Sequence, residues 1–158
     1  MLYATLKAVH LLALIVWIGG MAFSQFFLRP ALTALDGPAR LRLMRDVLGR
    51  FFAAVTLAAG LVLASGLWMI GHVSTQAAES GGHLRMPIAW MLMAALGLLM
   101  IGIFGHIRWV LYPRLSRAVA ASNWPAGAAA MAQIRGWVSV NLGIGVLIVV
   151  STVVGAAI

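Results

Sequence analysis

The sequence predicts an all-α integral membrane protein, a four-helix bundle with both termini on the periplasmic side. Of its 158 residues, 63% are hydrophobic and only 9% are charged, which is more apolar surface than a soluble domain of this size can hide. Four apolar stretches each reach the roughly 20 residues that cross a bilayer. We therefore expect one transmembrane domain over residues 1–158, with spans at about 3–28, 51–71, 86–107 and 136–158.

The first span carries a histidine on a helical face that it shares with Leu14 and Trp17. His10 precedes these residues by four and seven positions, so all three lie on one side of a helix. A titratable imidazole inside a span is costly unless it faces protein, water, a metal or a cofactor. His10 is therefore a candidate ligand. We expect Arg29-Pro30 to end this helix, because the residue before a proline is pushed away from helical geometry.

The second span follows a helix start signal, Asp36-Gly37-Pro38. Residues 38–50 are interpreted as a basic amphipathic helix lying on the membrane surface, with a solvated loop face as the alternative. We expect the small residues Gly19-Gly20 and Ala59-Gly60 to lie at helix contacts. A polar loop is expected over residues 72–85.

The third span contains several methionines and His106, and Arg108 follows it directly. An alanine-rich helical connection, broken at Asn123-Trp124-Pro125, is expected to lead into the fourth span. Asn141, early in that span, is expected to form a hydrogen bond between helices.

Orientation follows from the basic residues. Nine arginines lie in the segments after the first and third spans (Arg29, Arg40, Arg42, Arg45, Arg50, Arg108, Arg114, Arg117 and Arg135), against Lys7 and Arg85 on the other side. The positive-inside rule places both segments in the cytoplasm. We expect a multi-pass protein of the bacterial inner membrane, with the net charge of +8 meeting anionic lipid rather than nucleic acid.

Polar chemistry is scarce. The chain has no cysteine, which excludes thiol catalysis and thiolate metal sites, and its three acidic residues all lie in predicted loops. No carboxylate pair, serine triad or phosphate loop is present. We assign no catalytic residue, and a haem-dependent oxidoreductase is the enzyme class left open.

Copper binding on the outer face is the leading hypothesis. Imidazole binds copper, and a methionine thioether is a soft ligand that favours Cu(I). The candidate ligands share the outer face and are His10, His72, His83, Met69 and Met86. Solvated loop histidines and methionines that serve only in packing are the alternatives.

Two further hypotheses are carried. A b-type haem on the outer face would take His10 with His72, or with His83, as axial ligands. A haem on the inner face would instead rest on His106, with Arg29, Arg108 and Arg135 pairing its propionates. Glycines on several spans also suit an accessory subunit that packs against a copy of itself or a larger membrane complex.

Residues 10–23, HLLALIVWIGGMAF, resemble the opening helix of the copper-resistance protein D (CopD) family. The resemblance continues in RFFAAVTLAAGLVLASGLW (50–68) and in PRL (113–115), and it implies copper movement or tolerance at the inner membrane. The chain is also similar to the bacterial protoporphyrinogen-oxidase-like membrane proteins in His106 and Asn141, which implies haem b. It departs from that pattern where a lysine is expected near Met86.

Overall fold

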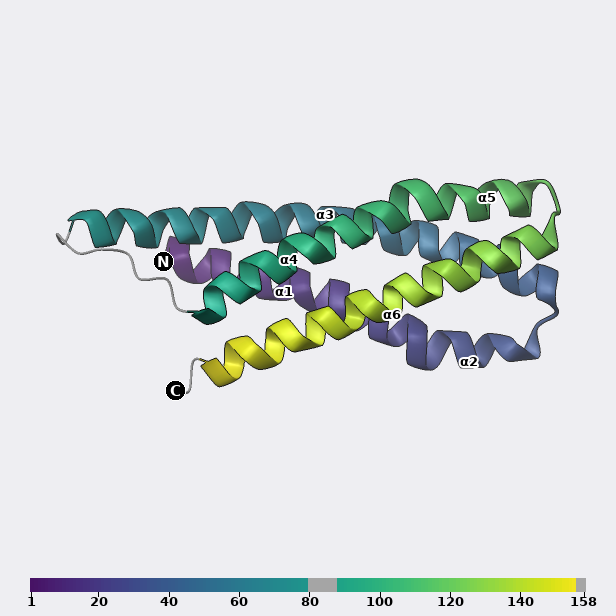
Figure 1. Ribbon diagram of the computed structural model, residues 1–158, viewed down its shortest axis with the longest axis horizontal. Helices are drawn as coiled ribbons and strands as arrows, with labels where there is room; N and C mark the ends of the chain where they lie inside the picture. Colours follow the sequence, from purple (N-terminus) through teal and green to yellow (C-terminus); the bar gives the residue numbers. More distant parts are fainter. Residues whose placement is uncertain (80–87, 156–158) are drawn as a thin grey trace.

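The computed structural model describes residues 1–79 and 88–155 and consists of long helices packed side by side (Figure 1). In chain order the elements are α1 (Leu2–Phe23), the π-helical turn η1 (Ser24–Leu28), α2 (Arg29–Ala31), the 3-10 turn η2 (Leu32–Ala34), α3 (Gly37–Glu79), α4 (Ile88–His106), the π-helical turn η3 (Ile107–Leu111), α5 (Tyr112–Ala120) and α6 (Trp124–Gly155). No strand occurs in the described ranges, so the predicted all-α class is confirmed.

The helices alternate in direction along the chain, and α1 begins at the same end of the bundle at which α6 finishes (Figure 1). α1 packs mainly on α3, and α4 packs mainly on α6. Four helical runs are long and apolar enough to cross a membrane, which confirms the predicted membrane bundle. We call the end that holds residues 29–50 and 108–135 the arginine end, and the opposite end the terminal end.

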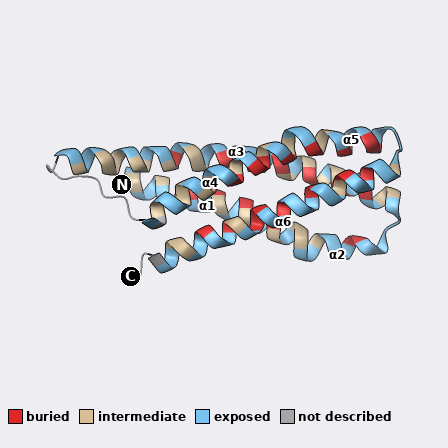
Figure 2. Cartoon of the chain, in the orientation of Figure 1, coloured by how far each residue is buried: buried red, intermediate tan, exposed pale blue. Residues whose placement is uncertain are grey.

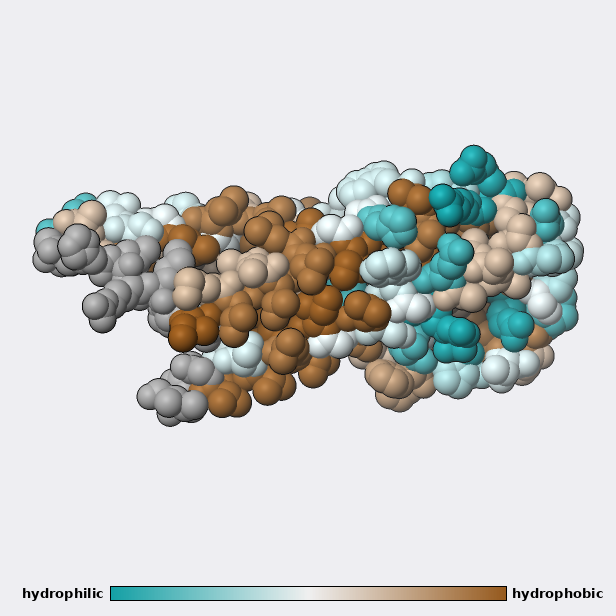
Figure 3. All heavy atoms as spheres, viewed as in Figure 1, coloured by the Kyte–Doolittle hydropathy of each residue, from teal (hydrophilic) through white to brown (hydrophobic). Residues whose placement is uncertain are grey.

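The helices run well past the apolar spans. α3 has 43 residues, which corresponds to about 65 Å, roughly twice the ~30 Å hydrocarbon core of a bilayer. Residues 38–50 neither lie along the membrane surface nor form a loop, because they continue straight into the second span with Leu41, Met44 and Leu48 buried in the bundle. On the face shown in Figure 3, hydrophilic residues gather at the arginine end, whereas hydrophobic residues dominate the middle of the molecule.

The first helical run continues through Pro30, so the expectation that it ends at Arg29-Pro30 is wrong. Arg29 itself is helical, with φ −61° and ψ −47°. A proline cannot donate to the carbonyl four residues earlier, and its ring crowds that carbonyl. The π-helical turn before Pro30 absorbs this mismatch with one extra residue, and η3 precedes Pro113 in the same way.

The expected loop at residues 72–85 is also wrong in its first half, because α3 continues to Glu79. The hydroxyls of Ser74 and Thr75 donate to the carbonyls of Ile70 and Gly71, at 2.8 and 3.1 Å. These polar residues are satisfied by their own helix and do not interrupt it. The rest of that loop, with His83, and the start of the third span, with Met86, lie outside the described residues.

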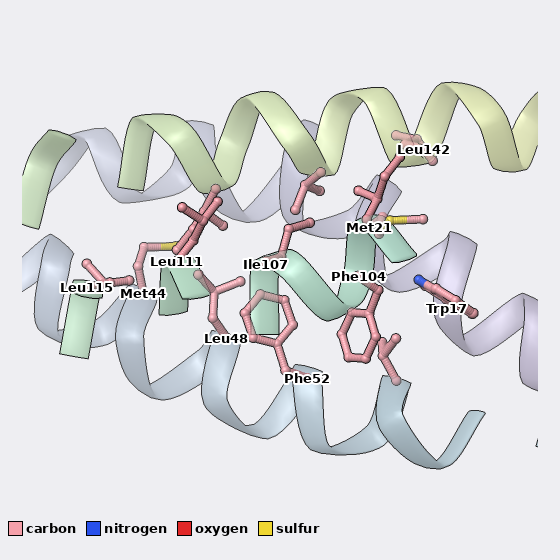
Figure 4. Close-up of a cluster of buried hydrophobic side chains, with 14 of the residues drawn as sticks. Trp17, Met21, Met44, Leu48, Phe52, Phe104, Ile107, Leu111, Leu115 and Leu142 are labelled. Atoms are coloured by element: carbon pink, nitrogen blue, oxygen red, sulfur yellow. The ribbon is translucent and has the colours of Figure 1, made fainter. Parts of the chain in front are cut away.

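A chain of aromatic side chains links the helices at the middle of the core (Figure 4). Phe104 of α4 meets Trp17 of α1 and Phe52 of α3 edge-on, with ring centroids 5.7 and 5.9 Å apart, and Phe52 meets Tyr112 at 5.5 Å. Edge-on aromatic pairs stabilise the fold beyond the contribution from burying their apolar surface. Buried residues continue from this point toward the arginine end (Figure 2), so that end is a packed bundle and not a set of loops.

Of the four small residues that were predicted to lie at helix contacts, two do. A Cβ added at Gly20 would collide with the ring of Phe51, and Ala59 is buried. Gly19 and Gly60 face open space, since a Cβ at either would meet no atom within 4 Å. One member of each pair therefore lies at a helix contact.

This difference gives a matched test of the α1–α3 contact. Gly20→Ala should lower stability by about 1–3 kcal/mol relative to Gly19→Ala, because only the first methyl overpacks the interface while both gain helix propensity. Thermal unfolding of the two variants in detergent measures the difference. Equal melting temperatures would contradict the observed packing of Phe51 on Gly20.

Asn141 on α6 is a buried polar residue whose expected hydrogen bond is absent. The residue is 1% exposed, and its Oδ1 has no donor among the described residues. A buried acceptor without a partner costs about 1–3 kcal/mol, whereas an apolar side chain at the same place avoids that cost.

Asn141→Leu should therefore leave the melting temperature unchanged or raise it. Thermal unfolding in detergent measures the effect. Asn141→Asp is the comparison variant, which adds a buried charge and should unfold at a lower temperature. A fall of several degrees for Asn141→Leu would mean that Oδ1 holds an ordered water or another donor.

Candidate functional site

His10 lies on the inner face of α1 and is 8% exposed. Its ring faces α3 at Gly66, where an added Cβ would lie 3.5 Å from His10 Cε1. The imidazole thus lies at ordinary van der Waals distance from this point of α3. As predicted from the sequence, His10 and Trp17 share a buried face of the helix.

The hydrogen bonds of His10 indicate which ring nitrogen carries its proton. Nδ1 lies 2.9 Å from Ser65 Oγ, and that hydroxyl donates to the carbonyl of Leu61 at 2.5 Å. We assign the neutral tautomer with its proton on Nδ1, because Ser65 has one hydroxyl proton and can then accept from His10 while it donates to Leu61. In this tautomer Nε2 is the nitrogen that keeps its electron pair.

The imidazole borders a cavity of about 130 Å³ between α1, α3 and α4. Among the described residues that line this cavity, His10 is the only one with an ionisable side chain. Met93 and Met100 of α4 also line it, with Gly97 between them. The cavity therefore combines one nitrogen donor with two thioether side chains in an apolar setting, which suits a soft ion such as Cu(I).

His72 lies apart from His10 along α3. Its ring stacks on Trp68, with centroids 5.0 Å apart, and lies 6.0 Å from the ring of Tyr3. Ser65 and His72 are seven residues apart on one helix, about 10 Å of rise. His72 and the half-buried Met69 therefore form a separate group nearer the terminal end.

The structure describes three of the five candidate outer ligands, His10, His72 and Met69, and His83 and Met86 fall outside it. Across residues 1–79 and 88–155, no group of three or more histidine, cysteine or acidic side chains could hold a metal ion. A copper site with three side-chain ligands in these ranges would have to include another ligand type, such as a thioether.

The remaining candidates lie toward the arginine end. His106 is exposed, with its ring 5.5 Å from that of Trp137, and the helix continues through it into η3. Arg108 lies over the ring of Tyr112 at 5.5 Å, and the exposed Arg29 borders a second, larger cavity. His106 and His10 thus lie in different parts of the bundle.

Three residues of the His10 site were not predicted as its members. Ser65, Met93 and Met100 are not among the candidate ligands that the sequence predicts. The signal for the methionines was their spacing, because residues seven apart lie on one face of a helix. Nothing in the sequence links Ser65 to His10, 55 positions away.

Comparison with known proteins agrees with a role in copper biology. The family model described as copper resistance protein D matches residues 45–155. Searches of curated proteins and of solved structures give no match. The matched region covers well over half of the chain, and it contains Ser65, Met93 and Met100. The four apolar helical runs and the family match together show a multi-pass membrane protein, and the chain belongs to the copper resistance protein D family.

Proposed function

We propose that this protein binds and passes on copper as Cu(I) in the bacterial inner membrane, at a site centred on His10. The observation that carries the proposal is the buried imidazole, whose Nδ1 is hydrogen-bonded to Ser65 and which borders a methionine-lined cavity. Membership of a family linked to copper resistance supports the choice of metal.

The chemistry of the residues suits Cu(I). Nε2 of His10 would be the nitrogen ligand, and the sulfurs of Met93 and Met100 would be the soft ligands. A hydrogen bond to the other ring nitrogen fixes the orientation of a ligating histidine and raises its basicity, which is the role proposed for Ser65. The imidazole must be neutral to bind, so protons compete with the metal.

The outer group would receive the ion before it reaches His10. His72 and Met69 lie nearer the terminal end on α3, and the proposal keeps His83 and Met86 as further outer ligands. Copper would then move along α3 from the outer group to the buried site, as cargo rather than as a resident cofactor.

The haem b and accessory-subunit hypotheses stay predictions from the sequence, as does the likeness to the protoporphyrinogen-oxidase-like proteins. No specific contact favours them over copper, because His106 is exposed against Trp137 and His72 is stacked on Trp68.

Orientation in the membrane is part of the proposal. The arginine end would face the cytoplasm, and the terminal end, with the copper entry group, would face the periplasm. The unequal distribution of arginines supports this choice.

Copper affinity tests the site directly. The purified protein should compete with a Cu(I) chelator under anaerobic conditions, and His10→Ala should remove this binding. Ser65→Ala should weaken it by about 10–100-fold, because the ligand loses the hydrogen bond that orients it. His106→Ala is the matched control, since that histidine is exposed elsewhere in the bundle, and it should bind as the wild type does.

Equal Cu(I) affinity in His10→Ala and the wild type would overturn the proposed site. An optical spectrum of the same samples separates the haem hypothesis, because a Soret band that disappears in His10→Ala would assign the histidine to haem instead.

Single cysteines test the orientation without background, because the chain has none of its own. In cells with a permeabilised outer membrane and an intact inner membrane, a membrane-impermeant maleimide should label Ser80→Cys but not Ala34→Cys. Ala34 is exposed at the arginine end, so it should react once the cells are lysed. Labelling of Ala34→Cys before lysis would refute the orientation.

A further inference from the structure

A second cavity, of about 370 Å³, lies at the arginine end. Three arginines from three different elements border it: Arg29 of α2, Arg40 of α3 and Arg135 of α6. Its other walls are mainly apolar and include Leu32 and Trp124. Hydrophilic residues surround this part of the molecule in the space-filling view (Figure 3).

A hydrogen bond between the first and last helical runs sets the position of two of these arginines. Gln25 Nε2 donates to Ser139 Oγ at 2.8 Å, and Ser139 donates in turn to the Arg135 carbonyl at 3.0 Å. Arg29 follows Gln25 by four residues, and Arg135 precedes Ser139 by four. Both therefore lie about one turn from this bond, on the side of the arginine end, and they border the same cavity.

The three guanidinium groups have no carboxylate partner among the described residues. Asp46 pairs with Arg45 at 2.8 Å, and Glu79 ends α3 at the far end of the bundle. Asp36 is exposed just before α3 and forms no ion pair with an arginine in the described ranges. Three like charges around one cavity repel one another unless an anion joins them.

We propose that this cavity binds the phosphate group of an anion, and that an anionic phospholipid is the source the geometry favours. Guanidinium groups match phosphate oxygens with paired hydrogen bonds, which makes arginine the usual residue for such recognition. The proposal is independent of copper binding at His10.

The position of the cavity indicates a lipid head group. Arg29 directly follows the apolar stretch of the first run, and Arg135 directly precedes that of α6, so both lie where head groups meet the hydrocarbon core. The apolar walls, including Leu32 and Met131, suit the glycerol and first methylenes of a lipid better than a free ion.

Lipid titration on the full chain in detergent tests the proposal. Native mass spectrometry should show phosphatidylglycerol binding in preference to phosphatidylcholine. Arg29→Gln with Arg135→Gln should weaken phosphatidylglycerol binding by about tenfold or more, as expected for the loss of charged hydrogen bonds. The control pair, Arg114→Gln with Arg117→Gln, removes the same charge from exposed α5 positions at the same end and should change binding by less than about twofold.

A parallel arm with inorganic phosphate separates the two sources. One outcome would assign the site to a soluble anion. Phosphate would stabilise the wild type but not the Arg29→Gln, Arg135→Gln variant, and the wild type would show no preference for phosphatidylglycerol. An equal loss of binding in both double variants would overturn the proposal, because it would reflect surface charge alone. Absence of preferential binding of either probe would overturn it as well. Thermal unfolding of both variants checks that they are folded.

Discussion

The hydrogen bond between His10 and Ser65 is the interaction on which the site in the apolar half depends. His10, Ser65 and Asn141 are the buried polar residues in the described ranges, and a polar group away from water is costly unless it is paired. The bond at 2.9 Å satisfies both partners and joins α1 to α3. The other ring nitrogen, Nε2, is the proposed copper ligand.

The number and type of the helices could be predicted from the sequence, because the bilayer sets how long an apolar stretch must be. Their ends could not. The rule for residues before proline is local, and it does not include the π-helical turn that carries the chain through Pro30. Polar residues 72–79 also read as a loop, although their hydroxyls bond to their own helix. Residues 38–50 were expected to lie on the membrane surface because of their amphipathic pattern. They belong to the bundle instead, since Leu41 and Leu48 are buried in it.

The candidate site was predicted in part. An imidazole inside a span is unusual enough to mark His10 from the sequence alone. Its partners depend on the register between α1, α3 and α4, which residue spacing within one helix does not determine. Met93 and Met100 therefore line the same cavity as His10, whereas the predicted Met69 does not. The arginines indicated orientation, but their gathering around one cavity depends on how the first and last helical runs pack, which the local pattern does not determine.

The coordination of bound copper tests the central claim most directly. X-ray absorption at the copper edge of the Cu(I)-loaded protein reports the elements bound to the metal. Our account predicts sulfur ligands together with one imidazole nitrogen, and loss of the imidazole contribution in His10→Ala. A spectrum with nitrogen and oxygen ligands only, unchanged by that substitution, would contradict it.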